Sequence, residues 1–182
     1  LRGAHDAPGT SRRTDRPGPM KGKFTAGRLL QRWRIALGRM PGWKFAALVF
    51  IVSFAAKATA LLLFGVTTGI EDADIDPERA RRIGWFVVVI VAPLAETLVA
   101  QALVIWLVRK ALPKSFWWPV IFSAGVFGSG HQAGPAYLAC MLAIGLIWAF
   151  AYLSRFERRG FAQAFWLVFL IHASNNAIAF II

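Results

Sequence analysis

Four side chains that are able to take part in acid–base chemistry lie inside apolar stretches of this 182-residue chain: Glu96, His131, His172 and Asn176. A carboxylate can remove a proton from water, an imidazole can share that proton, and an amide can donate a hydrogen bond to a developing oxyanion. Polar groups at membrane depth are costly and usually face a bundle interior or a wet cavity. We therefore interpret these side chains as a candidate hydrolytic site below a membrane surface.

The spacing within the last apolar stretch indicates a polar seam on one helix. His172, Asn175 and Asn176 stand at positions i, i+3 and i+4 of "LVFLIHASNNAIAF", and such positions share a helical face. Glu96 is the only acid in any apolar stretch. Each residue alone is also explained by hydrogen bonding between helices. Because the residues come from three separate stretches that can pack together, the set as a whole favours one common site.

A further ionisable side chain, Lys57, lies in the middle of the apolar stretch "SFAAKATA". Its amine can reach toward a membrane surface or pair with an acid. We expect Lys57 to serve structure or topology rather than chemistry.

The composition is typical of a membrane protein with several spans. Hydrophobic residues make up 57% of the chain and charged residues 16%, below the ~25% of an average soluble domain. The single cysteine, Cys140, excludes a disulfide within the chain. The net charge of +12 is concentrated in residues 1–44, which hold eleven Lys or Arg and two acids. Since no aromatic-basic interleaving follows, we predict an anionic lipid partner for this basic arm and no nucleic acid.

These observations predict an all-α, polytopic membrane bundle with about five transmembrane helices. Residues 1–23 are rich in Pro, Gly and Arg and are predicted to form a disordered basic arm. Residues 24–42 mix Leu, Trp and Ile with Arg, a pattern typical of an amphipathic helix at the membrane interface. Residues 43–182 form the predicted transmembrane domain. Its spans are expected at about 43–70, 83–108, 116–131, 135–153 and 161–182.

The charged loops predict one orientation of the bundle. The basic arm, "RKALPK" and "SRFERRG" fall on one side, and the acidic loop "EDADIDPERARR" falls on the other. The positive-inside rule then places the N-terminus in the cytoplasm and the chain in the cell membrane. Most tryptophans near predicted span ends are expected to anchor the chain at the interfaces. These are Trp43, Trp85, Trp106, Trp117, Trp118, Trp148 and Trp166.

The polar residues of the stretch 83–182 resemble, in order and spacing, the CPBP (Abi) family of intramembrane endopeptidases, which includes the CAAX prenyl endopeptidases. That family carries three motifs, EExxxR, FxxxH and HxxxN. The second is matched by "FGSGH", from Phe127 to His131, and the third by "HASNN", through His172 and Asn176. The first corresponds to "ETLVAQ", which agrees only at its leading residue, Glu96. Three motifs in order on three apolar stretches make the resemblance more specific than any one of them.

The resemblance implies an all-α protease-like domain and an enzyme that hydrolyses a peptide bond of a membrane-associated protein or peptide. Glu96 would activate water with the help of His131, and His172 with Asn176 would stabilise the oxyanion. Thr97, Gln101, Phe127 and Asn175 would support the site. By analogy with the family we expect no cofactor, although Glu96, His131 and His172 are also a chemically suitable ligand set for a catalytic zinc ion.

Thr97 and Gln101 stand where the family often has a second Glu and an Arg. These positions are i and i+4, so on a regular helix they share a face. We expect a hydroxyl and an amide to replace an ion pair by hydrogen bonding, as a variant of the site that keeps Glu96. The departure leaves the substrate open, including whether prenylation is involved.

Two other functions fit the same residues. The first is a non-catalytic membrane protein of this fold, such as an immunity or scaffold factor, in which the polar seam is structural. The second is a proton-coupled transporter, because acid–imidazole pairs can relay protons. Five spans without an internal repeat argue against a transporter.

Overall fold

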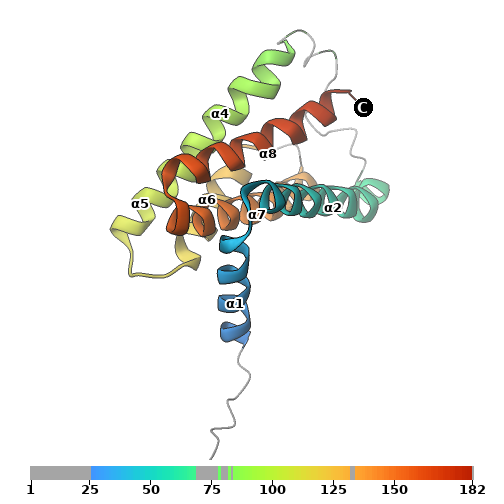
Figure 1. The fold of residues 1–182 in the computed structure, drawn as a ribbon. Coiled ribbons are helices and arrows are strands. Elements are labelled where there is room, and N and C mark those ends of the chain that lie inside the picture. Colours follow the sequence, from blue (N-terminus) through green and yellow to red (C-terminus); the bar gives the residue numbers. More distant parts are fainter. Residues whose placement is uncertain (1–25, 69–77, 79–81, 83, 132–133, 182) are drawn as a thin grey trace, which may run out of the picture.

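A computed structural model describes residues 26–68, 78, 82, 84–131 and 134–181, and helices make up almost all of them (Figure 1). No strand occurs in these parts of the chain, so the predicted all-α fold is confirmed. The predicted disordered arm, residues 1–23, lies outside the described residues. The elements are α1 (Ala26–Arg39), α2 (Gly42–Thr68), the π-helix η2 (Val87–Val91), α4 (Ala92–Glu96), the π-helix η3 (Thr97–Leu103), α5 (Val104–Ala111), α6 (Trp117–Ser129), α7 (Pro135–Arg159) and α8 (Phe161–Ile181).

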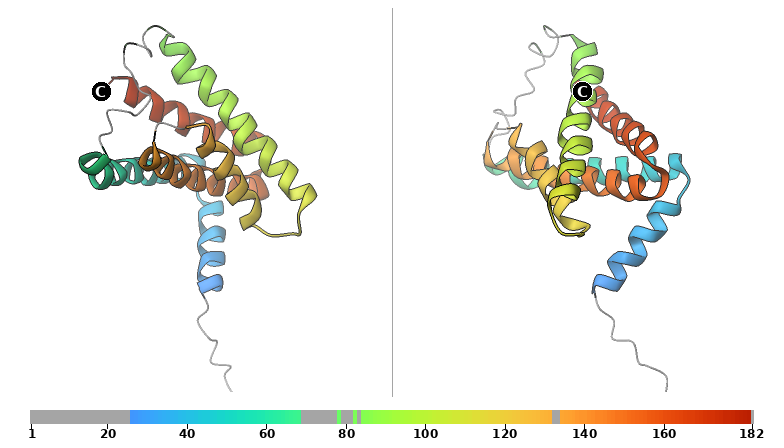
Figure 2. Two further views of the ribbon diagram at one scale, coloured as in Figure 1. Left: turned by 180° about the vertical axis from the view of Figure 1, so that it is seen from behind. Right: turned by 90° about the vertical axis from the view of Figure 1, so that its left-hand side faces the viewer.

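Helix α7 lies at the centre of the bundle, where it contacts α1, α2, α6 and α8. Its buried residues include Met141, Ile144, Gly145 and Trp148, which recur at the spacing of one helical face. Helix α8 lies alongside the rod formed by η2, α4, η3 and α5, and α1 projects away from the rest (Figures 1 and 2). The core is therefore built around one regular helix that every other layer touches.

The rod from Val87 to Ala111 is one helix with two π-helical segments, and Pro93 accounts for the first. The amide of Ala92 donates to Val87 O, five residues back, and Pro93 has no N–H to donate. Val88 O therefore lacks its usual donors at i+4 and i+5. Asn176 Nδ2 on α8 donates to it instead, at 3.0 Å.

The second π-helical segment also leaves a backbone carbonyl of the rod without its usual donor. The amide of Val104 donates to Val99 O and Gln101 O and so bypasses Ala100 O. Ser123 Oγ on α6 donates to Ala100 O at 2.8 Å. Because a bypassed carbonyl needs an outside donor in an apolar core, each π-helical segment fixes a neighbouring helix to the rod.

Glycine permits the close approach of α6 and α7. A Cβ on Gly128 would lie 2.6 Å from Leu142 Cδ2, and a Cβ on Gly145 would lie 3.0 Å from Ala124 Cα. Neither distance leaves room for a side chain. Small residues let membrane helices pack at short range, and here they bring the end of α6 against the first half of α7.

Three helices in the described part of the chain are long and apolar enough to cross a membrane: Gly42–Ala60 within α2, the rod Val87–Ala111, and Pro135–Arg159. Helix α6 has 13 residues, too few for a hydrocarbon core of about 30 Å. Helix α8 has 21 residues, but it contains the polar seam of His172, Asn175 and Asn176 and is not one of these three helices. A membrane protein is thus confirmed, whereas five spans are not. Helix α1 occupies the segment predicted to be interfacial, and its position at an interface stays a prediction.

Candidate active site

The carboxylate of Glu96 and the imidazole of His172 face each other across two helices. Glu96 is the last residue of α4, where the rod changes to the π-helix η3, and His172 lies in the second half of α8. Glu96 Oε2 lies 3.4 Å from His172 Nε2. The His172 side chain is 3% exposed and that of Glu96 is 35% exposed. The acid therefore reaches accessible space while the imidazole behind it is enclosed.

The contact between these two groups is not an aligned hydrogen bond. Glu96 Oε2 and His172 Nδ1 are both buried and have no hydrogen-bond partner in the described chain. Long or poorly aligned contacts of this kind are common in catalytic sites without substrate, and they tighten when substrate binds. The arrangement is therefore suited to receive a further polar group between the two side chains.

His131 lies two residues beyond the end of α6, and its ring turns back toward that helix. Its amide donates to Gly128 O at 2.9 Å, and its Nδ1 lies 2.8 Å from Phe127 O. Since a carbonyl only accepts hydrogen bonds, Nδ1 carries the proton and Nε2 keeps a free lone pair. His131 lies within electrostatic range of both Glu96 and His172. The structure thus brings together three ionisable residues from three separate segments.

Two buried aromatic rings hold the imidazoles in place. The ring centroid of Phe127 lies 4.8 Å from that of His131 and 5.7 Å from that of His172. The Trp148 ring lies 4.3 Å from His172 and 5.3 Å from Phe127. The indole N–H of Trp148 donates to Ser53 Oγ on α2 at 2.9 Å. Because packing fixes the ring that contacts it, His172 has little freedom to rotate.

The prediction that Trp148 anchors the chain at an interface is wrong. Its side chain is 1% exposed, whereas the other six tryptophans near predicted span ends are exposed. Helix α7 continues to Arg159 instead of ending near Leu153, so roughly 16 Å of helix separates Trp148 from that end. Its position on the same helical face as Ile144 and Gly145 is the sequence signal that could have identified it as buried.

Lys57 lies nearer to the site than its predicted structural role requires. It stands one helical turn after Ser53 on α2, on the face that packs against α7. Its ammonium is within electrostatic range of His172 and of Cys140 on α7. The sequence offered no motif that connects Lys57 with His172, because only the packing of α2 against α7 and α8 brings them together.

The two asparagines of α8 make different contacts. Asn176 donates to Val88 O, and Asn175 Nδ2 donates to Ile171 O at 2.9 Å within its own helix. Asn176 is half-buried, and one of the two N–H groups of its amide remains for another acceptor. Asn176 therefore fixes α8 to the π-helical segment that precedes Glu96.

The expected hydrogen bond between Thr97 and Gln101 does not form. Both side chains are fully buried, and neither Thr97 Oγ1 nor the two polar atoms of the Gln101 amide has a hydrogen-bond partner among the described residues. Both residues belong to the π-helix η3, where bonds run from i to i+5. Positions i and i+4 still lie on one side of a π-helix, so shared spacing alone does not bring the two groups into contact, and they do not replace an ion pair by hydrogen bonding.

The described residues contain no group of three His, Cys, Asp or Glu side chains arranged to hold a metal ion. In particular, Glu96, His131 and His172 are not assembled as zinc ligands, and Nδ1 of His131 is already engaged by Phe127 O. A site of this geometry would have to rearrange before it could bind zinc through all three residues.

The comparison with protein families agrees with the motifs. Residues 79–178 match the family model described as type II CAAX prenyl endopeptidase Rce1-like, a stretch that contains Glu96, His131, His172 and Asn176 and leaves out α1 and α2. No curated protein and no solved structure gives a significant match. Since the family model covers more than half of the 182 residues, the earlier resemblance is confirmed, and the chain belongs to the Rce1-like family of type II CAAX prenyl endopeptidases.

Proposed function

We propose that this chain is a glutamic-type intramembrane endopeptidase that hydrolyses a peptide bond of a membrane-associated protein or peptide. Membership of a protease family supports the reaction class. The observation that carries the proposal is the approach of Glu96 and His172 to 3.4 Å inside an apolar helix bundle, with His131 within electrostatic range of both.

In the first step, a water molecule lies between Glu96 and the free Nε2 of His131 and attacks the carbonyl carbon of the substrate. One proton of the water passes to the Glu96 carboxylate, and a C–O bond forms as the carbonyl π-bond becomes an oxyanion. The Nε2–H of His172 and the second N–H of Asn176 donate hydrogen bonds to that oxyanion. Fixed donors in a dry site stabilise such charge strongly, because nothing has to reorganise.

In the second step, the oxyanion collapses and the C–N bond breaks. The proton held by Glu96 passes to the departing nitrogen, so the products are a carboxylic acid and an amine, and Glu96 returns to its starting form. This sequence needs one acid that reaches accessible space beside an enclosed imidazole. The exposures of Glu96 and His172 provide that combination.

We propose where the substrate lies, at the membrane, and not its amino-acid sequence. The name of the family indicates prenylated proteins with a CAAX terminus. This chain keeps the leading Glu96 of the first family motif, but where charges are common it has Thr97 and Gln101, which are buried without a hydrogen-bond partner among the described residues. We therefore propose a membrane-associated peptide as substrate and make prenylation one variable of the test.

The test is cleavage of a peptide, with and without a prenylated cysteine, by the purified full chain in detergent micelles. Glu96→Gln keeps the shape of the side chain and should reduce kcat by about 10³-fold, and His131→Ala by about 10²-fold or more. The control Glu78→Gln removes an exposed acid and should leave the rate unchanged. A chelator should not reduce the rate.

Three outcomes would contradict the proposal. Full cleavage by a folded Glu96→Gln variant would exclude Glu96 as the base. Loss of helical circular dichroism in Glu96→Gln would indicate the scaffold function instead. Loss of activity on chelation, restored by zinc, would replace the glutamic mechanism with a metal-assisted one.

We further propose that the basic end of the bundle faces the cytoplasm of the cell. The last turns of α5 and α7 lie at this end, and each carries two cations, among them Lys110 on α5 and Arg159 on α7. Ser115→Cys, made together with Cys140→Ser, should react with a membrane-impermeant thiol reagent only after the cells are permeabilised. Labelling of intact cells would show that this end of the bundle faces outward, opposite to the proposed orientation.

A further inference from the structure

An apolar pocket lies beside the candidate active site and does not include it. The pocket has a volume of about 530 Å³ and is formed mainly by η3, α5 and the adjoining turns of α7 and α8. It begins at Leu98, two residues after Glu96, and extends to Arg109 and Lys110 in the last turn of α5. Its volume lies within the range of pockets that bind small ligands.

The walls of this pocket have the character of a groove that is open to lipid. Tyr152 and Ile105 form a buried floor, each 1% exposed. Leu103 and Phe161 on the walls are about half exposed, which in a membrane bundle means contact with hydrocarbon. A pocket with apolar walls and a lateral opening fits a hydrocarbon chain of the surrounding bilayer.

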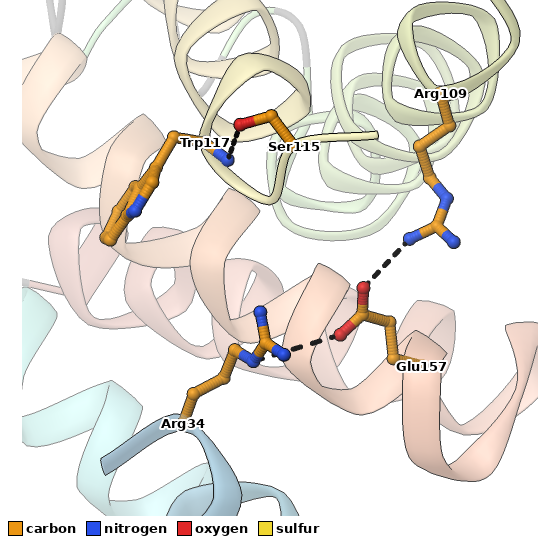
Figure 3. Close-up of polar contacts among 5 residues, drawn as sticks. All are labelled: Arg34, Arg109, Ser115, Trp117 and Glu157. Carbon is orange, nitrogen blue, oxygen red and sulfur yellow. Dashed lines mark hydrogen bonds and ion pairs between the residues drawn. The ribbon is translucent and has the colours of Figure 1, made fainter. Parts of the chain in front are cut away.

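The far end of the pocket carries an excess of positive charge. Arg109 Nη1 lies 3.1 Å from Glu157 Oε1, and Arg34 Nε on α1 lies 4.0 Å from Glu157 Oε2 (Figure 3). Lys110 Nζ lies over the Trp106 ring, 3.9 Å from its centroid. Among the described residues Glu157 is the one acid that pairs with Arg34 and Arg109, and no described acid pairs with Lys110. We call Arg34, Arg109 and Lys110 the basic rim, and its charge is compensated by a single carboxylate.

From this geometry we propose that the pocket is a binding site for an anionic phospholipid of the bilayer. One acyl chain lies on the floor formed by Tyr152 and Ile105, and the phosphate lies at the basic rim, mainly against Lys110. The uncompensated charge favours a lipid with a net negative headgroup over a zwitterionic one. Since Glu157 joins Arg34 of α1 to Arg109 of α5, the headgroup would lie where α1 meets the bundle.

The proposal does not depend on proteolysis, so it is tested in the Glu96→Gln variant of the full chain. Native mass spectrometry in detergent would compare binding of phosphatidylglycerol and phosphatidylcholine with the same acyl chains. Lys110→Gln should weaken phosphatidylglycerol binding by about fivefold, the factor that corresponds to ~1 kcal/mol per basic side chain near lipid phosphate. Leu103→Trp, which fills the pocket from its lipid-facing wall, should weaken binding of both lipids.

Lys114→Gln is the matched control, because Lys114 is an exposed cation four residues further on that does not line the pocket. It should leave the preference for phosphatidylglycerol unchanged. Equal affinity for the two lipids, or an equal loss in Lys114→Gln, would overturn the proposal and indicate diffuse charge attraction. If a prenylated peptide competed with phosphatidylglycerol and this competition did not change in Lys110→Gln, the proposal would also be overturned. The pocket would then be assigned to the tail of a substrate. If Leu103→Trp unfolds at a lower temperature, the comparison of Lys110→Gln with Lys114→Gln decides alone.

Discussion

Two helices of equal length perform different tasks in this bundle. The rod Val87–Ala111 and helix α7, Pro135–Arg159, each have 25 residues. Helix α7 is regular from end to end, whereas the rod changes three times between α-helical and π-helical geometry. The irregular helix carries the catalytic acid of the proposed mechanism, and the regular helix carries the aromatic ring that supports its partner imidazole.

The two helices also differ in how many of their buried polar atoms have hydrogen-bond partners. On α7, Trp148 donates to Ser53, and Arg155 donates to Gly38 O and Met40 O at 3.2 and 2.9 Å, although Ser154 Oγ has no partner in the described chain. On the rod, Thr97, Gln101 and one oxygen of Glu96 are all buried without hydrogen bonds to described residues. Unsatisfied buried groups cost free energy and concentrate at functional sites. The comparison indicates that α7 stabilises the fold while the rod holds reactive groups at a cost.

The largest effect that we expect from this contrast is at Trp148. Trp148→Ala removes a fully buried ring from the contact with His172 and Phe127 and should lower the free energy of unfolding by about 3–5 kcal/mol. Trp148→Phe keeps most of the packing and loses the hydrogen bond to Ser53, so it should cost about 1 kcal/mol. Both values can be measured by unfolding in mixed detergent micelles with increasing fractions of sodium dodecyl sulfate.

Trp106→Ala is the control for Trp148→Ala, because the Trp106 ring is half exposed on the rod. It should change the free energy of unfolding by less than about 1 kcal/mol. If Trp106→Ala were as destabilising as Trp148→Ala, the regular helix would not be the main source of stability.

The sequence predicted the fold well, because long apolar stretches leave few alternatives in a membrane. Its limits were set by contacts between helices. The π-helical segments depend on whether a neighbouring helix can satisfy a bypassed carbonyl, as Asn176 and Ser123 do. The motif spacing also contains no information about α2, so the position of Lys57 near His172 follows only from tertiary packing.

Within the candidate site, the sequence predicted which residues take part but not all of their contacts. The family resemblance implies Glu96 with His131 as the water-activating pair, and the structure adds a contact between Glu96 and His172. The i and i+4 spacing predicted a Thr97–Gln101 hydrogen bond that does not form, and both side chains are buried without a partner among the described residues. Helical spacing thus places side chains on one side of a helix but does not determine which hydrogen bonds they make.

An intermediate effect should come from the coupling of Pro93 and Asn176. Asn176→Leu leaves Val88 O buried without a donor and should lower the free energy of unfolding by about 1–3 kcal/mol. Pro93→Ala restores an N–H at the position that can donate to Val88 O. In the double variant the loss caused by Asn176→Leu should therefore shrink, with a coupling energy of about 1 kcal/mol in a double-mutant cycle.

This cycle sharpens the contrast between the helices, because it asks whether the irregularity of the rod is caused locally. Additive effects of Pro93→Ala and Asn176→Leu would show that Val88 O does not depend on Asn176, and the π-helical segment would need another cause. The same double variant should also lose cleavage activity, since the π-helical segment that it changes ends five residues before Glu96 on the same rod.

The smallest effect concerns two buried hydroxyls at the rod. Here the sign of the change in the free energy of unfolding is the test. Thr97→Val removes a hydroxyl that has no hydrogen-bond partner in the described part of the chain and should raise the free energy of unfolding by about 1 kcal/mol. Ser123→Ala removes the hydroxyl that donates to Ala100 O and should lower the free energy of unfolding by a similar amount, measured by the same micellar unfolding. Opposite signs are expected because desolvation is uncompensated at the first hydroxyl and compensated at the second. If both variants were destabilised, Thr97 would have a partner in solution, such as a buried water, and the rod would be less costly than its geometry indicates.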